Sequence, residues 1–445
     1  MANKILDNYT ITHEGFSVKV HIVAIGGRLK KYHLVSKKIP LATRALLDKV
    51  QQDLVNLVTV SAKEILDPKA VEEVKARFKE KAKEVLDKKL PEIKPSVRDL
   101  LIMNMMKDML GLGDLDLLAN DEYLEEIVVT ASNEPIRVFH KIYGWLETNV
   151  YLRDEIQARE YFNIIGRRVG RQITTLHPLL DANLLSGDRA NAVLYPISTK
   201  GNTLTIRKFS RDPWTVTDLI KNKTANPYIF ALIWFAIQYE SNILISGGTG
   251  SGKTSFLNVC MPFIPPNHRI VSIEDTRELM LPKFLFWCPL TTRESNPEGK
   301  GEVTMLDLLI NTLRMRPDRV ILGEMRKQEQ AEVLFEAMHT GHSVYATVHA
   351  GSVATTIRRL VNPPLEVPTN LLEAVNLNIV TYRNRQQNIR RVYEIGEFIL
   401  AEEKGNGFSV KPNVIYRWDP HSDKIVKAKK AINFFRNLEH VTGLS

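Results

Sequence analysis

The stretch "ILISGGTGSGKTSF", residues 243–256, joins an apolar run to a glycine-rich turn, and a lysine and a threonine follow directly. It fits the pattern G-x-x-x-x-G-K-[ST]. Glycines let backbone N–H groups point inward without a clash from Cβ atoms, and the N-terminus of a following helix adds a positive dipole end. The stretch therefore predicts a loop that holds a triphosphate, placed between a strand and a helix.

The loop itself supplies the expected ligand-binding residues. Lys253 should reach the β- and γ-phosphates, and the Thr254 hydroxyl should ligate Mg²⁺. ATP and Mg²⁺ are the ligands that this pattern favours over a flexible glycine turn with an incidental lysine. The residues assigned to nucleotide binding are Gly247, Gly248, Thr249, Gly250, Ser251, Gly252, Lys253, Thr254 and Ser255.

Helical stretches alternate with short apolar runs through the last half of the chain. The runs are "NILISGG", "RIVSIED", "RVILGEM" and "SVYATVHA". Strands separated by helices predict an α/β fold with a mostly parallel sheet covered on both faces, and ligands bind beyond the carboxyl ends of such strands. We expect residues 212–445 to form this P-loop domain.

The first half of the chain has two different patterns. "FSVKVHIVAI", Gly26-Gly27 and "RLKKYHLV" predict a β-hairpin, and a helical stripe follows in "DPKAVEEVKARFKEKAKEVLDKK". Beyond "GLGDL" the strand-like runs and the helical "EIQAREYFNIIGRRVG" indicate a small α/β domain. We therefore expect a helical and hairpin region over residues 1–112 and an α/β domain over residues 113–211.

The segment "SRDPW", residues 210–214, is typical of a linker, because Pro213 disfavours helix just before it. Either Thr215 or Thr217 would then cap the next helix.

Carboxylates follow two of the apolar runs. "RVILGE" ends in Gly323-Glu324, and a carboxylate there can polarise a water, so Glu324 is the expected general base. The usual P-loop pattern has an aspartate on this strand for the metal. Because Gly323 precedes the glutamate, we expect Glu324 to reach Mg²⁺ through water. "IVSIED" contributes Glu274 and Asp275; helix caps or surface ion pairs are the alternative roles for these acids.

Histidines flank another run. "HTGHSVYATVHA" carries His342 and His349 on either side of one strand, where they would hydrogen-bond the γ-phosphate or the glutamates. A satisfied structural role is the alternative. Arginines of the last half are expected mainly at the surface or in ion pairs; these are Arg293, Arg314, Arg316 and Arg326.

The composition of the 445-residue chain is that of a soluble globular protein, with 44% hydrophobic and 25% charged residues. The net charge of +9 permits contact with nucleic acid or a membrane surface without requiring it. Cys260 and Cys288 form no CxxC pair, which fits a reducing, cytoplasmic compartment. The N-terminus has no apolar core of a signal peptide. "YIFALIWFAI", residues 228–237, is shorter than the ~20 residues of a membrane span and predicts a buried helix.

Four ordered segments resemble the secretion ATPase superfamily: "GGTGSGKT", "SIEDTREL", "TLRMRPDRVILGEMR" and "AMHTGHSVYATVHAGS". They correspond to its Walker A, Asp box, Walker B and His box. Its members power type II and type IV secretion, type IV pilus assembly and the archaeal flagellum. The resemblance covers roughly residues 115–398, and "LTTRESNPEGKGEVTMLDLLINTLRMRPDR" most resembles the Tad-pilus and archaeal branches. Two cysteines cannot build the four-cysteine zinc element of many bacterial members.

The resemblance implies a homo-hexameric ring in which each α/β domain rests on the RecA-like motor of its neighbour, with ATP at the seam. Arg189 and Arg207 would approach the γ-phosphate, whose charge arginines stabilise in the transition state. The same resemblance assigns Glu274, Glu324 and His342 to hydrolysis. The ring would sit peripherally on the cytoplasmic membrane, bind a polytopic platform protein, and move pilin-like cargo indirectly.

Two other functions are compatible with a P-loop domain. A RecA-like core with a net charge of +9 also suits a nucleic-acid-translocating ATPase, although no basic stripe interleaved with aromatic residues is present. A regulatory nucleotide binder with weak turnover is the third alternative, and the intact glutamates argue against it. A filament-assembly or secretion motor is the function that the sequence favours.

Overall fold

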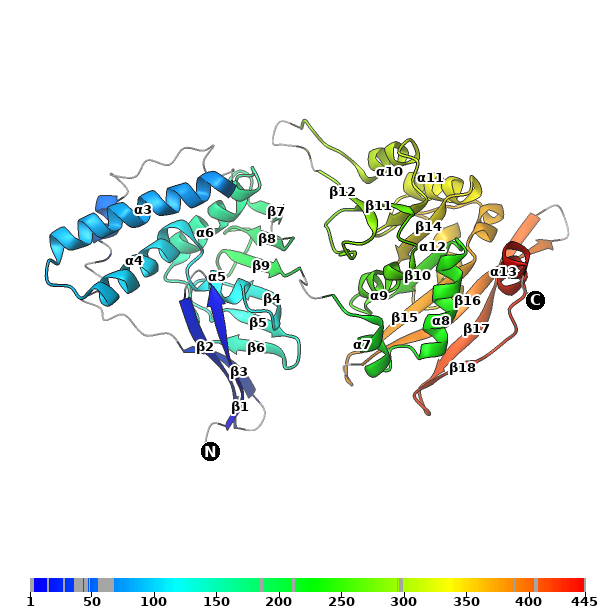
Figure 1. Ribbon diagram of the computed structural model, residues 1–445, viewed down its shortest axis with the longest axis horizontal. Helices are drawn as coiled ribbons and strands as arrows, with labels where there is room; N and C mark the ends of the chain where they lie inside the picture. Colours follow the sequence, from blue (N-terminus) through cyan, green and yellow to red (C-terminus); the bar gives the residue numbers. More distant parts are fainter. Residues whose placement is uncertain are drawn as a thin grey trace. The chain divides into compact units, whose positions relative to one another are not determined.

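The computed structural model describes residues 4–13, 16–26, 29–35, 43, 47, 49–54, 68–184, 187–209, 213–293, 295, 299–387, 389–403 and 407–443. The chain divides into two compact units, Met1–Arg211 and Asp212–Ser445, and each is considered by itself (Figure 1). Residues 210–212 of the expected linker lie outside the described residues.

The first unit is built on one nine-stranded sheet in the order β1-β2-β3-β6-β5-β4-β9-β8-β7. All neighbouring strands are antiparallel except β3 and β6, which run parallel. The strands are β1 (Lys4–His13), β2 (Phe16–Ile25), β3 (Leu29–Val35), β4 (Leu124–Val129), β5 (Arg137–His140), β6 (Gly144–Thr148), β7 (Leu179–Asn183), β8 (Arg189–Val193) and β9 (Thr203–Arg207). The expected hairpin is confirmed as β2 and β3, and β1 adds a further strand. Because β3 pairs with β6, the hairpin shares a sheet with the strands of residues 113–211.

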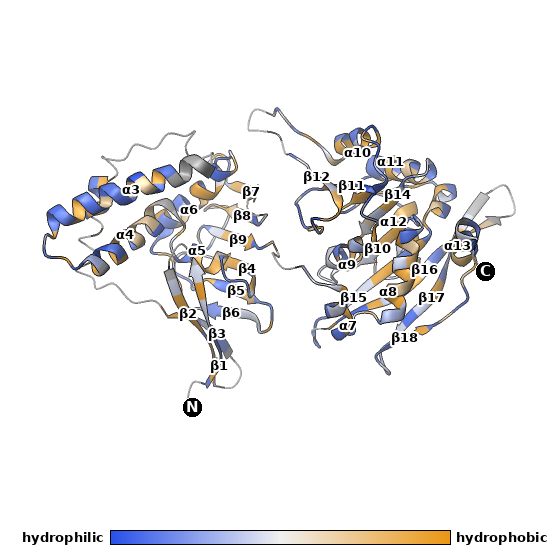
Figure 2. Cartoon of the chain, viewed as in Figure 1, coloured by the Kyte–Doolittle hydropathy of each residue, from blue (hydrophilic) through white to orange (hydrophobic). Residues whose placement is uncertain are grey.

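The helices of the first unit are α3 (Pro68–Lys89), α4 (Pro95–Leu110), α5 (Asp114–Ala119) and α6 (Glu155–Arg168). The predicted stripe of α3 is buried at Val74, Phe78 and Ala82. It packs against α4, while the remaining face of α3 is largely hydrophilic (Figure 2). Residues of α5 and α6 instead pack on the sheet, so the first unit has two separate cores.

The second unit has its own nine-stranded sheet, in the order β12-β11-β13-β14-β10-β15-β16-β17-β18. Its strands are β10 (Ile243–Gly247), β11 (Arg269–Glu274), β12 (Phe286–Thr291), β13 (Arg319–Leu322), β14 (Ser343–Val348), β15 (Leu377–Asn384), β16 (Ile389–Glu403), β17 (Gly407–Asp419) and β18 (Lys424–Lys427). In sheet order, the strands from β12 through β10 to β15 pair in parallel, and the pairs from β15 to β18 are antiparallel.

This sheet is mixed: the six strands from β12 to β15 in sheet order run parallel, as expected for the motor domain, and the strands beyond β15 add an antiparallel part. The four apolar runs do form parallel strands. The chain beyond β15 returns through short connections, such as the one that pairs Asn384 with Ile389, and these are too short for the crossover that a parallel strand requires.

Helices cover both faces of the second sheet. They are α7 (Val216–Lys221), α8 (Pro227–Gln238), α9 (Lys253–Cys260), α10 (Met305–Leu313), α11 (Gln328–His339), α12 (Val353–Val361) and α13 (Phe434–Thr442), with short 3₁₀ turns η1 (Met261–Phe263) and η2 (Thr369–Ala374). Alternate residues of β10 face the helical layers on opposite sides of the sheet. Ile243 and Ile245 pack with α8 and α9, while Leu244 packs with α11 and α12. A fully buried central strand is thus placed between two helical layers.

Two local predictions around α7 and α8 have definite outcomes. Thr215, rather than Thr217, caps α7 in a capping box with Asp218. The apolar run does form a helix, α8, but it is buried on one face only: Tyr228 is 60% and Trp234 56% exposed. In the described part of the chain, no helix is both long enough and apolar enough to span a membrane.

Candidate nucleotide-binding site

The glycine-rich loop leaves the carboxyl end of β10 and leads into α9, which begins at Lys253. Gly250 (φ 71°) and Gly252 (φ 89°) adopt left-handed backbone conformations that favour glycine. A Cβ atom at Gly247 would lie 2.3 Å from Thr381 Oγ1 and 2.4 Å from Ser251 Oγ. Ser251 in turn donates a hydrogen bond to the Gly248 carbonyl at 2.8 Å. The neighbouring strand β15 thus holds the loop in place.

Three side chains beside the loop are in contact one after another. Lys253 Nζ lies 3.3 Å from His349 Nε2. His349 Nε2 in turn lies 3.4 Å from Glu324 Oε1. The residues come from three places in the sequence, but β10, β13 and β14 are parallel, so their carboxyl ends meet at one edge of the sheet. This edge is where a bound triphosphate would carry its γ-phosphate.

The charges of this group are tuned by burial. Burial lowers the pKa of Lys253, against the opposing effect of Glu324 and Glu278. Burial, and next the charge of Lys253, lower the pKa of His349, which keeps its imidazole neutral at neutral pH. A lysine held in a partly desolvated site interacts more strongly with an incoming phosphate than one in bulk water.

Arg326 links Glu324 of this group to a second carboxylate, Asp275. Its guanidinium lies 2.6 Å from Glu324 Oε2 and 2.9 Å from Asp275 Oδ2. An ion-pair role was expected for Arg326, and the structure adds that its partners are candidate site residues. The arginine fixes the Glu324 carboxylate while His349 contacts the other oxygen.

Glu274 ends β11 and is only 2% exposed. Its Oε1 accepts hydrogen bonds from the backbone of Glu278 (2.9 Å) and Leu279 (3.0 Å), whereas Oε2 has no hydrogen-bond partner among the described residues. Burial raises the pKa of Glu274 to about 7. A Cβ atom at Gly323 would meet Glu274 Cγ at 3.2 Å, so the glycine that replaces the usual aspartate makes room for this side chain.

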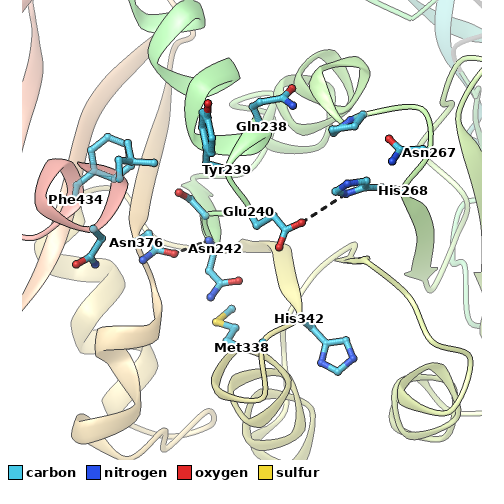
Figure 3. A pocket seen from close by; sticks show the side chains of 15 residues that line it. Gln238, Tyr239, Glu240, Asn242, Asn267, His268, Met338, His342, Asn376 and Phe434 are labelled. Carbon is cyan, nitrogen blue, oxygen red and sulfur yellow. Dashed lines mark hydrogen bonds and ion pairs between the residues drawn. The ribbon is translucent and has the colours of Figure 1, made fainter. Parts of the chain in front are cut away.

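His342 lies elsewhere. It immediately precedes β14, and its N–H donates to the Ala337 carbonyl at 3.0 Å. Because six strand residues separate it from His349, it sits at the amino edge of the sheet, opposite the loop. There it lines a cavity of about 550 Å³ in which Glu240 pairs with His268 at 3.8 Å (Figure 3). The expectation that His342 contacts the phosphate is corrected: the two histidines flank one strand and therefore lie at opposite edges, and only His349 reaches the site.

The arginines expected near the γ-phosphate belong to the first unit. Arg189 and Arg207 are cross-strand neighbours on β8 and β9. Arg189 forms a bidentate pair with Asp181, at 2.5 and 2.9 Å. Arg207 ends β9, shortly before the chain enters the second unit. Their approach to a nucleotide stays a prediction.

A metal ion at this site would depend on the nucleotide. In the described part of the chain, no group of three or more histidine, cysteine, aspartate or glutamate residues is placed to hold an ion. Thr254 lies in the first turn of α9, directly after Lys253. Mg²⁺ binds with few protein ligands, several waters and substrate phosphates, so a single hydroxyl at this position fits its needs.

Three residues at the loop have no local sequence signal. Thr381 donates to the Ser246 carbonyl at 3.1 Å, Arg390 Nε donates to the Gly250 carbonyl at 3.1 Å, and Arg383 lies against Gly250. They come from β15 and β16, more than a hundred residues after the loop, and only strand pairing brings them there.

The fold is a mixed α/β fold with a glycine-rich loop at the carboxyl end of β10, and comparisons with known proteins give the family. A profile of the family described as "Type II/IV secretion system protein" matches residues 189–392. The type IV secretion system protein PtlH of Bordetella pertussis is 30% identical over 275 residues, which are 57% of this chain and 78% of PtlH. The chain therefore belongs to the type II/IV secretion ATPase family, which confirms the resemblance of the four motifs.

Relatives from Methanocaldococcus jannaschii are more similar in sequence. The uncharacterized protein MJ0900 is 39% identical over 339 residues, 75% of this chain and 60% of its own length. The uncharacterized protein MJ0781 is 44% identical over 52% of this chain and 32% of its own length. The chain thus spans less than two thirds of each of these two relatives. Among solved structures, the pilus retraction motor PilT with bound ADP is 19% identical, with 74% of this chain and 88% of PilT covered and a TM-score of 0.47.

Proposed function

We propose that this protein is an ATP-hydrolysing motor of the secretion ATPase family, with a RecA-like domain over residues 212–445. The observation that carries the proposal is the contact series from Lys253 through His349 to Glu324 beside a loop of Walker A sequence. A lysine, a neutral histidine and a carboxylate at the carboxyl edge of parallel strands are the groups that bind a γ-phosphate and activate a water.

In the proposed reaction, Lys253 and the backbone N–H groups of the loop hold the β- and γ-phosphates. Mg²⁺, when bound, would take the Thr254 hydroxyl and phosphate oxygens as ligands and neutralise part of the charge, with Glu324 reached through water. Glu324 orients and deprotonates the attacking water, and Arg326 holds this carboxylate in position. Glu274, with a pKa of about 7 and one oxygen that has no hydrogen-bond partner among the described residues, serves as a second proton acceptor.

The proposed active site is shared between subunits of a homo-hexameric ring. Arg189 and Arg207 stand side by side in the first unit, and in this proposal they come from a neighbouring subunit to meet the γ-phosphate. The division into residues 1–112, 113–211 and 212–445 belongs to the same proposal, with the middle part resting on the next motor domain.

The proposed partner is a polytopic platform protein at the cytoplasmic face of the membrane, with pilin-like subunits moved indirectly. Membership of the type II/IV secretion family supports this setting. An archaellum-like or pilus-like filament is part of the same proposal, as the resemblance of residues 290–319 to the Tad-pilus and archaeal branches implies.

The test measures ATP turnover against protein concentration for the full chain and for Glu324→Gln. We expect specific activity to rise cooperatively with concentration, and Glu324→Gln to lose about 100-fold or more in turnover while still binding nucleotide. Glu329→Gln, an exposed glutamate on α11, is the matched control. Activity per subunit that stays flat from dilute protein upward would exclude the shared site. Retained turnover in Glu324→Gln would exclude the assigned base.

A further inference from the structure

Two arginines of the β15–β16 pair lie directly against the tip of the glycine-rich loop. Arg383 and Arg390 are cross-strand partners. Arg390 Nε donates to the Gly250 carbonyl at 3.1 Å, and a Cβ atom at Gly250 would lie 2.8 Å from Arg383 Nη1. The loop therefore has glycine at position 250 for two reasons, its left-handed φ of 71° and the guanidinium that occupies the space of a side chain.

The pair has features that its contribution to folding does not explain. Like charges on directly opposed strand residues destabilise a sheet. Arg383 Nε is buried and has no hydrogen-bond partner among the described residues. A buried donor without an acceptor costs free energy. A ligand surface that attracts a guanidinium, such as the π-face of a base, offsets part of the like-charge cost.

The position of the pair indicates which part of a nucleotide it meets. β10 lies between β14 and β15, so His349 at the end of β14 and Arg383 at the end of β15 are on opposite sides of the loop. Two strand spacings separate them by about 10 Å. If the γ-phosphate is beside Lys253 and His349, the triphosphate crosses the loop and its ribose and base emerge on the side of the arginines.

We propose that Arg383 and Arg390 form the nucleobase seat of this site, with the purine ring stacked on the Arg383 guanidinium. A guanidinium is planar and stacks well on aromatic rings, which a lysine ammonium does not do. Arg390 is a positioning residue, because its bond to the Gly250 carbonyl ties the second arginine to the loop. The phosphates are served by Lys253 and the backbone N–H groups. This inference rests on the proposed function, since it concerns the same bound nucleotide.

The experiment compares the binding of ATP and of inorganic tripolyphosphate, each with Mg²⁺, to the full-length protein by calorimetry. The variants are Arg383→Gln, Arg383→Lys and Arg390→Gln, and the control is Arg385→Gln, an exposed arginine of the same hairpin. We expect both Arg383 variants to bind ATP about tenfold more weakly, and tripolyphosphate with less than about twofold change. Arg385→Gln should bind both ligands like the wild type. Binding of tripolyphosphate also reports that the loop is intact in each variant.

The remaining outcomes separate this inference from the proposed function. Full rescue of ATP binding by Arg383→Lys, or a parallel loss of ATP and tripolyphosphate binding, means that the arginine meets phosphate, and overturns the nucleobase seat. Equal wild-type affinity for ATP and tripolyphosphate also overturns it while leaving the ATPase function standing. A wild-type protein that binds neither ligand overturns the proposed function, and the inference with it.

Discussion

The direction of β14 decides which of its two flanking histidines lies beside the glycine-rich loop, and that residue is His349. Its imidazole lies between Lys253 and Glu324, and burial, followed by the charge of Lys253, lowers its pKa. His342 has the same side chain and differs only in lying at the other end of β14. The pair is therefore a matched comparison for the assignment of the site.

We expect His349→Ala to lower ATP turnover by about tenfold or more, because it removes the side chain that contacts both Lys253 and the proposed general base, Glu324. His342→Ala should stay within about twofold of the wild type. Steady-state turnover at saturating ATP measures both. Equal losses in the two variants would contradict the placement of the site at the carboxyl edge.

Glu274 adds a pH dependence that belongs to a single buried carboxyl. Its pKa is about 7 in the folded protein against an ordinary 4.5, so the folded state binds the proton more tightly than the unfolded state. Its stabilising effect is present below pH 4.5 and is lost as the pH rises through about 7. Between these limits, unfolding releases a proton, and higher pH therefore favours unfolding.

We expect the wild-type free energy of unfolding to fall, relative to Glu274→Gln, by up to about 3 kcal/mol between about pH 4.5 and about pH 7.5. Glu274→Gln lacks the titrating group and should not show this component. Urea denaturation of both proteins across the pH range measures the difference. A wild type whose stability instead rises through this range relative to the variant would show that Glu274 is ionised in the folded state.

At the scale of elements, the loop depends on the strand beside it. β10 and β15 pair in parallel, and the Thr381 side chain closes against the first glycine of the loop. The contact leaves no room for a methyl group at Gly247. At Gly248, by contrast, no heavy atom of the described residues, apart from its chain neighbours, lies within 4 Å of the Cβ position.

We expect Gly247→Ala to destabilise the protein by about 1–3 kcal/mol, because the added methyl overpacks the join between β10 and β15. It should also weaken ATP binding. Gly248→Ala should leave the stability within about 0.5 kcal/mol of the wild type, as for substitutions away from close packing. Chemical denaturation and nucleotide titration compare the two. Similar destabilisation by both would contradict the described packing of the loop.

At the scale of the whole molecule, the residues assigned to the proposed site come from both units. The loop, Glu274 and Glu324 lie in Asp212–Ser445, whereas Arg189 and Arg207 lie in Met1–Arg211. A shared site in a ring makes the two groups separable by mutation, because one subunit can supply what another lacks.

We expect Arg207→Ala and Glu324→Gln each to be inactive alone and to regain part of the activity when mixed. In a mixed ring, some subunit interfaces combine a motor domain that keeps Glu324 with a neighbouring subunit that keeps Arg207. Arg167→Ala, which removes an exposed arginine of α6, is the control and should keep full activity. ATP turnover of mixtures at several ratios measures the effect. Absence of any recovery, with assembly verified by sedimentation, would contradict a site shared between subunits.

Much of the second unit was predictable because its signals are local. The strand-loop-helix order, the four parallel strands and the carboxylates that follow them all depend on short stretches with strong hydrophobic periodicity or turn chemistry. Thr215 and Thr217 were equivalent by sequence, and the hydrogen bond from Asp218 to Thr215 separates them only in the folded helix. The antiparallel extension from β15 to β18 had no such motif, so the direction of its strands was not predictable.

The sequence by itself determined the glycine-rich loop, the elements around it, the acids at the ends of β11 and β13, and the family. Those properties reside in neighbouring residues, whose backbone conformations and charges are set locally. Only the tertiary structure decided that His349 and not His342 reaches Lys253, that Gly323 leaves space for Glu274, and that Arg383 and Arg390 close on Gly250. These contacts depend on strand order and direction, which pairing between distant segments establishes and no single segment encodes.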